Sequence, residues 1–361
     1  MSPEHVERLS KHKFEAGDIV YGRRGDIGRQ ALIRPEQKGW LCGTGCLRLS
    51  FGDSVLDPLF LHYYLRQGAV VRWISNQAVG ATLPNLNTGI LRSVPVSFPS
   101  LPTQRRIAGI LSAYDDMIEN NRKRIRILEA MARALYREWF VNFRYPGHEN
   151  IPLVPSSLGE IPKGWEVKKL AELVTTKYGY TESTNESPIG PKYLRGMDIN
   201  KTSYIDWLYV PYCPISEDDK TSYAIKVGDV FVIRMADPGK VGIAEQEVDA
   251  VFASYLIRVR PTDDRISPYF LFYLLDSPAY QSYISGASTG TTRKSASAGV
   301  ITDFQFALPP RNLIAEFEVR VKTFRKSLIM LLQQIQNLRR TRDLLLPRLL
   351  SGQMKLQIEK V

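Results

Sequence analysis

Two long stretches of the chain carry apolar residues at alternating spacings of three and four, the pattern of a helix seam. They cover residues 103–144 and 311–357 and contain few Gly or Pro residues. Each stretch is therefore predicted to form one long coiled-coil helix, interrupted once in its seam by a polar residue, Asn121 or Arg342. The apolar seam positions are Leu111, Tyr114, Ile118, Ile125, Leu128, Ala132, Leu135 and Trp139 in the first helix, and Val321, Phe324, Leu328, Leu331, Ile335, Leu338, Leu345 and Leu349 in the second.

The two seams belong to an internal repeat, because adding 210 to each position of the first gives the second. The repeat also covers the segments before the helices. FEAGDIVYGRRGDIG from Phe14 matches IKVGDVFVIRMADPG from Ile225, and DPLFLHYYL from Asp57 matches SPYFLFYLL from Ser267. Two copies of this length indicate a duplicated domain pair rather than an array of short units.

The segments before each helix show short apolar–polar alternations, such as DVFVIRM and SYLIRVR, separated by Gly-Asp turns. The predicted fold class is α+β, with two mixed domains separated by a long antiparallel two-helix coiled coil and related by a pseudo-two-fold axis. The predicted segments are a first mixed domain (1–102), a first long helix (103–144), a linker (145–161), a second mixed domain (162–310) and a second long helix (311–357).

The seam of each helix requires a partner of similar length, which the other repeat supplies. Two equivalent copies pack best around a two-fold axis, so we expect antiparallel helices with the mixed domains at opposite ends. The alternatives are that each helix packs on its own domain or mediates homodimerisation. Asn121 and Arg342 either fix the register of the pair or lie at an edge of it.

The charge of the chain lies in the helices. The net charge is +11 and the isoelectric point about 9.4, which favours an anionic partner such as nucleic acid. Residues 103–144 hold nine Lys or Arg and five Asp or Glu, and residues 311–355 hold ten and three, so the helices carry the whole excess. A basic rod of this kind suits a phosphate backbone, an acidic protein surface or simply a solvated face.

The composition excludes several classes of protein. Only Cys42, Cys46 and Cys213 are present, and no His cluster completes a metal site, so a reducing cytoplasm without a bound metal is expected. No apolar stretch is long enough for a membrane span. Phosphate-binding and dinucleotide-binding Gly-rich loops are absent, as is an [ND]-P-P-[YF] motif, which argues against an enzyme and for a binding or assembly protein.

Candidate DNA contacts lie in turn-rich segments of the mixed domains. The loop GASTGTTRKSASAG, residues 286–299, combines small and hydroxyl residues with a basic pair, which suits contact with phosphates and base edges. The alternative is a flexible surface loop, and its counterpart from Asn76 lacks the basic pair. KYLRGMDIN, from Lys192, is a second candidate, although its arginine also has an acidic partner within reach. The candidate DNA-binding residues are Arg23, Arg24, Arg29, Lys192, Tyr193, Arg195, Arg234, Lys240, Thr291, Thr292, Arg293 and Lys294.

Several sequence segments of the chain resemble those of a known family. KGWEVKKLAEL, KYLRGMDINKT, GTTRK and the helix ends LEAMARALYREWFVNF and RRTRDLLLPRLLSGQMKL are similar to those of the specificity subunit of Type I DNA restriction–modification systems. The resemblance covers nearly the whole chain. It implies two target-recognition domains, each reading one half of a bipartite DNA site, and helices that set the spacing between the half-sites.

The resemblance also implies partners. Two modification subunits would dock on the helices, bring S-adenosylmethionine and methylate adenine, and ATP-dependent restriction subunits with Mg²⁺ would join for cleavage. Catalysis would then lie in the partners, and this chain would hold no cofactor of its own. The alternative is a coiled-coil scaffold that binds proteins and does not recognise DNA sequence. A self-contained nuclease or methyltransferase is disfavoured by the missing motifs.

The chain departs from the family pattern at one place. The second copy has 63 residues between Pro162 and Ile225, whereas only 13 precede Phe14, so about 50 residues of the first recognition domain have no counterpart. Nothing equivalent to KYLRGMDIN is present in the first copy. We therefore expect the first domain to read DNA poorly or to require a second chain for completion.

Overall fold

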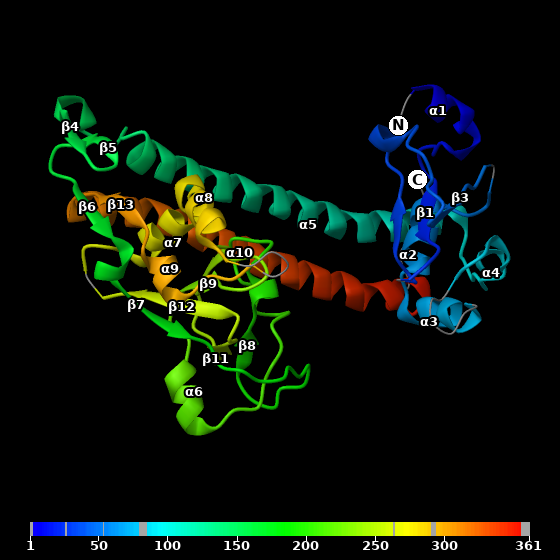
Figure 1. Cartoon of the computed structure of the whole chain (residues 1–361). Helices are drawn as coiled ribbons and strands as arrows, with labels where there is room; N and C mark the ends of the chain where they lie inside the picture. The colour runs from blue at the N-terminus through cyan, green and yellow to red at the C-terminus, as the bar shows by residue number, and fades with distance from the viewer. Residues whose placement is uncertain are drawn as a thin grey trace. The chain divides into compact units, whose positions relative to one another are not determined.

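The computed structural model describes residues 3–25, 27–52, 54–78, 85–262, 264–289 and 294–354. The chain divides into two compact units, shown with their elements in Figure 1. Unit 1 comprises residues 1–122 and 333–361, and unit 2 comprises residues 123–332. Each unit contains one mixed domain and a part of each long helix. The predicted α+β class with two mixed domains and long helices is confirmed.

The mixed domain of unit 1 is built on a three-stranded antiparallel sheet with the order β2-β1-β3. Helix α2 follows the sheet and starts where the Asp57 side chain accepts a hydrogen bond from the Phe60 amide, with Pro58 at the first helical position. The elements are α1 (Pro3–Arg8), η1 (Ser10–His12), β1 (Ile19–Gly22), β2 (Gln30–Leu32), η2 (Pro35–Gln37), β3 (Cys46–Leu49), α2 (Pro58–Leu65), α3 (Gly68–Gln77) and α4 (Thr88–Arg92).

The core of unit 1 has two parts. Ile19 and Tyr21 of β1 pack with Leu61 and Ile74 between the sheet and the short helices. On the other side of α2, apolar side chains of that helix pack on the long helices, so that α2 joins the sheet to them. This second cluster contains Phe60, Tyr63, Ile107, Ala108, Leu111 and Leu349.

Unit 2 repeats this plan with an additional strand. Its main sheet has the order β10-β9-β12-β7, in which β9 is buried throughout and β12 is partly buried along its length. Ser267 caps α7 as Asp57 caps α2, again with a proline at the first helical position. The first elements are η4 (His148–Asn150), β4 (Leu153–Ser156), β5 (Gly159–Pro162), β6 (Glu166–Lys169), η5 (Leu170–Glu172), β7 (Val174–Tyr178), β8 (Lys192–Leu194), η6 (Gly196–Asp198) and α6 (Glu217–Tyr223). They are followed by β9 (Val230–Ile233), β10 (Val241–Ile243), β11 (Ala250–Phe252), β12 (Leu256–Pro261), α7 (Pro268–Asp276), α8 (Pro278–Ala287), α9 (Ala298–Thr302) and β13 (Gln305–Leu308).

In the described part of unit 2, three smaller strand pairs complete the fold. Strands β11 and β8 pair in parallel, and β13–β6 and β4–β5 are antiparallel. Residues 145–161, expected to be a linker, instead form η4 and most of the β4–β5 hairpin, and Tyr145 packs on Trp165 with ring centroids 5.7 Å apart. The segment therefore belongs to the core of unit 2, because two large aromatic residues bury their rings there.

The long helices are α5 (Leu101–Tyr136), which continues into a π-helical turn at Arg137–Val141, and α10 (Arg311–Leu350). In unit 1, Asn121 donates a hydrogen bond to Gln334 at 3.2 Å. In unit 2, the Tyr136 and Phe317 rings are in contact. Residue numbers rise along one helix as they fall along the other, so the helices are antiparallel within each unit.

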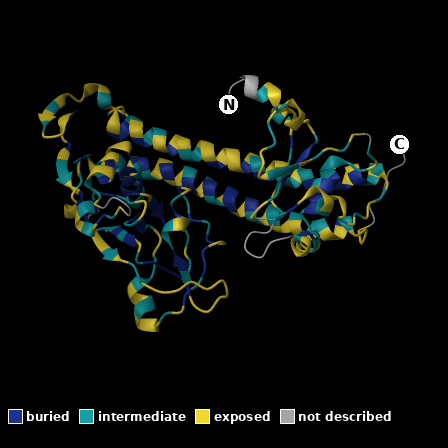
Figure 2. Ribbon diagram, turned by 45° about the vertical axis from the view of Figure 1, so that its right-hand side comes forward, coloured by how far each residue is buried: buried dark blue, intermediate teal, exposed yellow. Residues whose placement is uncertain are grey.

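The seam predicted from the spacing is confirmed, since every apolar position assigned to it is buried or half-buried. Figure 2 shows buried and exposed residues alternating along both long helices. Leu328 is fully buried, as are Leu111 and Val321. Both polar interruptions are paired across the helices, Asn121 with Gln334 and Arg342 with Asp115. They therefore help to fix the register and do not lie at an open edge.

The two sheets differ at one edge. In unit 2, β12 pairs with β9 on one side and with β7 on the other, whereas β3 of unit 1 pairs only with β1 among the described residues. The second core of unit 2, around Leu194, Ile205 and Trp207, covers Phe231 of β9. Unit 1 has Val20 at the position of Phe231, and nothing in its described part corresponds to that second core.

Candidate nucleic-acid interface

The turn between β9 and β10 is held in an unusual backbone conformation. Ala236 has a φ of 70° and Gly239 a φ of 98°. A side chain at position 239 would place its Cβ 2.4 Å from the Cγ2 atom of Ile284 in α8. Gln281 of the same helix donates a hydrogen bond to the Gly239 carbonyl at 2.7 Å. Only glycine fits at position 239, and the turn that carries exposed Lys240 is fixed to α8.

The loop of small residues lies directly beside this turn. Met235 and Ser295 form an antiparallel bridge, and the Ala236 amide donates to the Lys294 carbonyl at 3.0 Å. The Lys294 side chain is exposed. Thr291, Thr292 and Arg293, also predicted to contact DNA, lie outside the described residues. The turn and the loop, about sixty residues apart in the sequence, thus lie side by side, and they carry Lys240 and Lys294.

Arg234 stands at the entry to the turn with its guanidinium 4.9 Å from the centre of the Tyr178 ring. Its Nη1 lies 3.7 Å from the sulfur of Met235, and its shielded Nε has no hydrogen-bond partner in the described part of the chain. Tyr178 is 44% exposed. An arginine guanidinium stacked on an exposed aromatic ring offers a planar surface of the kind on which nucleic-acid bases stack.

A hollow of about 540 Å³ opens next to the turn. Arg195 faces it but is held by Asp198, which accepts from both Nε at 3.0 Å and Nη2 at 2.9 Å. The acid pairing left open for Arg195 by the sequence is therefore the one observed. The rim is formed by exposed Met197 and Tyr255. The other lining residues are Thr181, Glu182, Thr184, Tyr193, Gly196, Asn200, Ile233, Met235, Ala236, Asp237, Ala253 and Ser254.

Two of the predicted contact residues, Tyr193 in the lining of the hollow and its neighbour Lys192, are held by contacts within the protein. Tyr193 is 4% exposed, its hydroxyl donates to the Tyr180 carbonyl at 2.7 Å, and burial raises the pKa of its phenol. The Lys192 ammonium donates to the Val210 carbonyl at 2.6 Å and lies 4.0 Å from the centre of the Tyr212 ring. Their side chains are occupied by structural contacts, because an amphipathic Tyr or Lys can bury its body as readily as expose its tip.

Unit 1 repeats the loop-beside-turn arrangement. Arg24 and Asn85 form the bridge that Met235 and Ser295 form in unit 2, and the Leu86 amide donates to the Arg23 carbonyl at 2.9 Å. Arg23 also donates from Nε to the Leu86 carbonyl at 3.2 Å, so it supports the loop, whereas Arg24 and Arg29 are exposed. The two repeats therefore present the same pair of segments, each with exposed basic residues.

Sequence reasoning missed the aromatic and thioether rim of unit 2. Met235 lies in the turn and Tyr178, Tyr255 and Met197 lie around it, yet each sits in a short strand or turn where burial and exposure are equally compatible with the pattern. Period-two alternation from buried Val174 would place Tyr178 on the inward face of β7, so the pattern carried no signal for its exposure. Among the described residues, no group of His, Cys, Asp or Glu could hold a metal ion. No helix in the described ranges has the length and apolar character to cross a bilayer.

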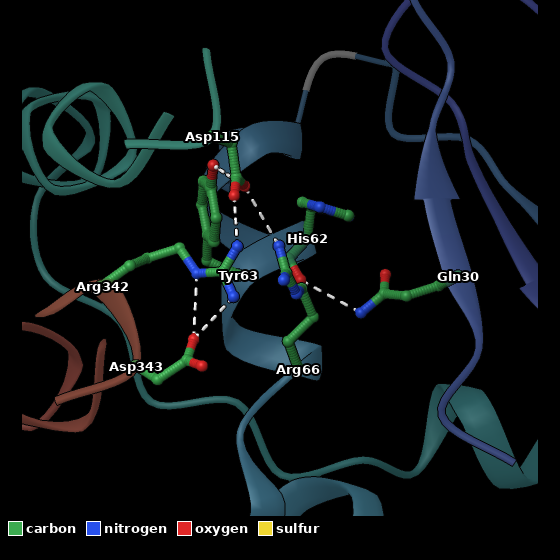
Figure 3. A network of polar contacts seen from close by, with 7 residues as sticks. All are labelled: Gln30, His62, Tyr63, Arg66, Asp115, Arg342 and Asp343. Atoms are coloured by element: carbon green, nitrogen blue, oxygen red, sulfur yellow. Dashed lines mark hydrogen bonds and ion pairs between the residues drawn. The ribbon is translucent and has the colours of Figure 1, made fainter. Parts of the chain in front are cut away.

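Where unit 1 is anchored to its helices, a polar network centres on Asp115 (Figure 3). Its carboxylate accepts from the Tyr63 hydroxyl at 2.8 Å, from Arg66 at 3.2 Å and from Arg342. Burial alone would raise the pKa of Asp115, but the hydrogen bonds from Arg342 and Tyr63 outweigh it, so the pKa is lowered. Asp115 therefore stays charged and holds both helices to α2.

His62 lies beside this network. Burial, with a smaller contribution from the charge of Arg66, lowers its pKa to about 4. Its shielded Nδ1 has no hydrogen-bond partner in the described part of the chain. Between pH 6.5 and 4 the unfolded chain binds a proton at this residue that the folded chain does not, so stability falls as the pH falls through this range.

Replacing His62 by Phe, the residue at the equivalent position 272, is expected to remove this pH dependence. Lowering the pH from 7 to 5 should cost the wild-type unit 1 about 1–2 kcal/mol in free energy of unfolding, and the variant much less. Thermal denaturation at both pH values measures the difference, with exposed His12→Gln as the control. Equal pH dependence in wild type and His62→Phe would remove His62 from this role.

Unit 2 has a more deeply buried counterpart. Arg325 of α10 is 1% exposed and donates from Nε to Glu245 at 2.7 Å, with a second bond from Nη2 to the same carboxylate. It also donates to the Ser203 hydroxyl and carbonyl, both at 2.8 Å. Tyr269 donates to Glu245 at 2.9 Å, and Ser203 donates to Glu129 of α5. These bonds join both helices to the mixed domain of unit 2.

Known proteins resemble this chain over most of its length. The family model for the Type I restriction modification DNA specificity domain matches residues 1–130 and 162–337, which is one match in each repeat. The Type I restriction enzyme MjaIX specificity subunit of Methanocaldococcus jannaschii is 26% identical over 98% of this chain and 81% of its own length. The MjaVIII specificity subunit of the same organism is 27% identical, over 81% of this chain and 66% of its own length.

Among solved structures, the S subunit of a Type-I restriction-modification system from M. genitalium is similar in fold. The match has a TM-score of 0.54 and a sequence identity of 17%, and it covers 92% of this chain and 82% of that one. It supports two mixed domains with long helices as the fold of this chain.

Proposed function

Because the chain belongs to the family of Type I restriction modification DNA specificity domains, whose model matches both repeats, we propose that each of its two units reads DNA sequence. The observation that carries this proposal is the repeated pairing of a loop with a turn. In both units the loop is bridged to the turn, at Arg24–Asn85 and at Met235–Ser295. A duplicated reading surface suits a site composed of two half-sites.

In unit 2 the reading surface is formed by the turn 234–240, the described part of the loop and the rim of the hollow. Exposed Lys240 and Lys294 would bind phosphates, and Arg234 on Tyr178 would stack on or bond to a base. Met197, Met235 and Tyr255 offer apolar contacts to base edges and to thymine methyl groups. Arg195 supports the lining of the hollow through its hydrogen bond to Asp198.

In unit 1 the corresponding surface is smaller. Arg24 and Arg29 would contact the backbone of the duplex from the turn, while Arg23 holds the adjoining segment through Leu86. The strand and second core that enlarge unit 2 have no counterpart in its described part. We therefore propose that unit 2 supplies more of the base-specific contacts than unit 1.

The partners follow from the same proposal. Double-stranded DNA is the ligand, and two modification subunits dock on the long helices, where Met117, Ile127, Met131 and Met330 are exposed apolar residues. Methylation with S-adenosylmethionine belongs to those subunits. ATP-dependent cleavage with Mg²⁺ belongs to restriction subunits that join them. This chain then recognises the DNA sequence and sets the spacing of its two half-sites, and catalysis is carried out by its partners.

Replacing both Lys240 and Lys294 by Ala is expected to weaken DNA binding by about 10- to 30-fold at low salt, because two phosphate contacts are lost. The dependence of the logarithm of affinity on the logarithm of salt concentration should become less steep by about 2. Fluorescence anisotropy with the modification subunits present measures both quantities. The matched control is Lys163→Ala, an exposed lysine after the β4–β5 hairpin.

Unchanged affinity and salt dependence in the Lys240→Ala/Lys294→Ala variant would exclude this turn and loop from the DNA interface. An equal loss in the Lys163→Ala control would show that only the net charge of the chain matters.

A further inference from the structure

The polar clusters that anchor the two units occupy equivalent positions of the repeat. In unit 1, Asp115 of α5 binds Arg66, at the end of α2, and Arg342 of α10. Arg342 in turn binds its neighbour Asp343 through Nε at 2.9 Å and Nη2 at 2.7 Å. The cluster thus has a basic residue on the mixed domain, an acidic residue on α5, and a basic–acidic pair on α10.

The equivalent positions in unit 2 carry the opposite charges. Arg325 stands at the position of Asp115, and Asp276, at the end of α7, stands at the position of Arg66. Arg133 of α5 replaces Asp343 and donates from Nε to Asp276 at 2.7 Å. The position of Arg342 is taken by Ala132, which is fully buried.

This inversion of charge distinguishes α5 from α10, which the apolar seam does not. The apolar seam residues of α5 and α10 are of the same kind at nearly every position, so the seam by itself would accept two copies of one helix. The anchor clusters differ, with a sign change at each of three charged positions. Further sign changes lie along the helices, at Arg106 and Glu316, Asp116 and Lys326, and Glu129 and Arg339. Charged residues beside a coiled-coil seam commonly decide which helices pair.

Pairing of α5 with the α5 of a second copy would mismatch unit 1. The opposite helix would present Ala132 and Arg133 where Arg342 and Asp343 now lie. Asp115, whose side chain is 27% exposed, would lose its partner across the helices. Arg133 would add a positive charge to the cluster that already contains Arg66, where Asp343 now supplies a negative one.

Pairing of α10 with a second α10 would mismatch unit 2 more strongly. Arg342 would enter the fully buried site of Ala132, on the face opposite Arg325, whose side chain is 1% exposed. Asp343 would take the place of Arg133 beside Asp276. Like charges in such a partly buried site repel with little screening by water.

We propose that the inverted anchor clusters make the helix seam selective for the unlike half of the chain. The surface of α5 accepts the helix that carries Arg342 and Asp343, and it rejects a helix that carries Ala132 and Arg133. The selection is independent of DNA reading, because neither cluster includes a residue of the candidate interface.

The mismatch can be built inside the intact chain. Ala132→Arg combined with Arg133→Asp gives α5 the pair that α10 carries, so unit 2 experiences the contacts of an α10–α10 pairing. We expect the melting temperature to fall by about 4–8 °C. Ala132→Met introduces a long side chain without charge and controls for crowding, and we expect it to cause less than half of that loss.

A second comparison isolates the charges at positions that are not fully buried. Arg133→Asp alone places two carboxylates together, since Asp276 lies 2.7 Å from the arginine that is replaced. Adding Asp276→Arg restores opposite charges in the arrangement of unit 1 and should return the melting temperature to within about 2 °C of the wild type. The proposal is overturned if Asp276→Arg gives no recovery, or if Ala132→Met destabilises as much as the charged pair.

Discussion

Replacing Arg325 by Met is expected to lower the free energy of unfolding of unit 2 by roughly 3–5 kcal/mol. The substitution leaves Glu245, whose side chain is 4% exposed, without its main partner. It also removes both hydrogen bonds from α10 to Ser203, so that Ser203 stays bonded to the long helices only through Glu129 of α5. Burial alone would lower the pKa of Arg325, but the Glu245 carboxylate raises it, so the guanidinium remains charged throughout the ordinary pH range.

Chemical denaturation of the intact chain measures this loss, with Lys326→Met, the exposed neighbour on α10, as the control. Adding Glu245→Gln should recover a large part of the loss, because it removes the uncompensated buried charge. A loss below about 1 kcal/mol for Arg325→Met would contradict the anchoring role. A double variant no more stable than Arg325→Met would show that the unpaired carboxylate is not the cause.

Replacing Gly239 by Ala is expected to destabilise unit 2 by roughly 2–4 kcal/mol and to abolish DNA reading by its turn. The positive φ of 98° disfavours any side chain at this position. In addition, the new Cβ would lie 2.4 Å from Ile284, which is 1% exposed and cannot move without disturbing the core. The turn must therefore shift away from α8, and Lys240 shifts with it.

The repeat supplies an internal control for this prediction. Gly28 has nearly the same φ, 99°, but a Cβ there would meet Val71 at 2.9 Å, and Val71 is only half-buried. Gly28→Ala should therefore cost less than Gly239→Ala. Thermal denaturation and DNA binding compare the two variants. Equal losses would mean that φ alone is responsible and that contact with α8 does not matter.

Much of the fold could be predicted from the sequence because its strongest signals are periodic. The seam residues of α5 and α10 repeat over about eight turns and have equivalents 210 residues away, so chance agreement is small. The caps at Asp57 and Ser267, each followed by proline, mark the starts of α2 and α7. Antiparallel pairing followed from the duplication itself.

The candidate site was less predictable, because it depends on which residues of short strands face outward. Tyr193 was expected at the surface but lies in the core, where its hydroxyl finds the Tyr180 carbonyl. For Arg195 the sequence allowed either a DNA base or an acidic side chain as its partner, and Asp198, three residues later, is the partner observed. Tyr178 and Tyr255 were not predicted at all. The neighbours that decide each case come from distant parts of the sequence.

The buried pair of Arg325 and Glu245 was also not predictable. Position 325 lies beside the seam and reads as an ordinary basic residue of a charged helix. Its burial results from Glu245, the Phe272 ring and the loop around Ser203, which contact its side chain from distant parts of the sequence. Asp115, at the equivalent position, is half-buried because unit 1 lacks this cover in its described part.

The central claim is that each unit reads its own half of a bipartite DNA site. Selection from a pool of random duplexes, with the modification subunits present, tests it most directly when wild type is compared with Lys240→Ala/Lys294→Ala. The account predicts a motif of two separated halves for the wild type. In the variant, sequence preference should be weakened in one half only, with the other half and the spacing unchanged. Loss of preference in both halves, or a single uninterrupted motif in the wild type, would contradict it.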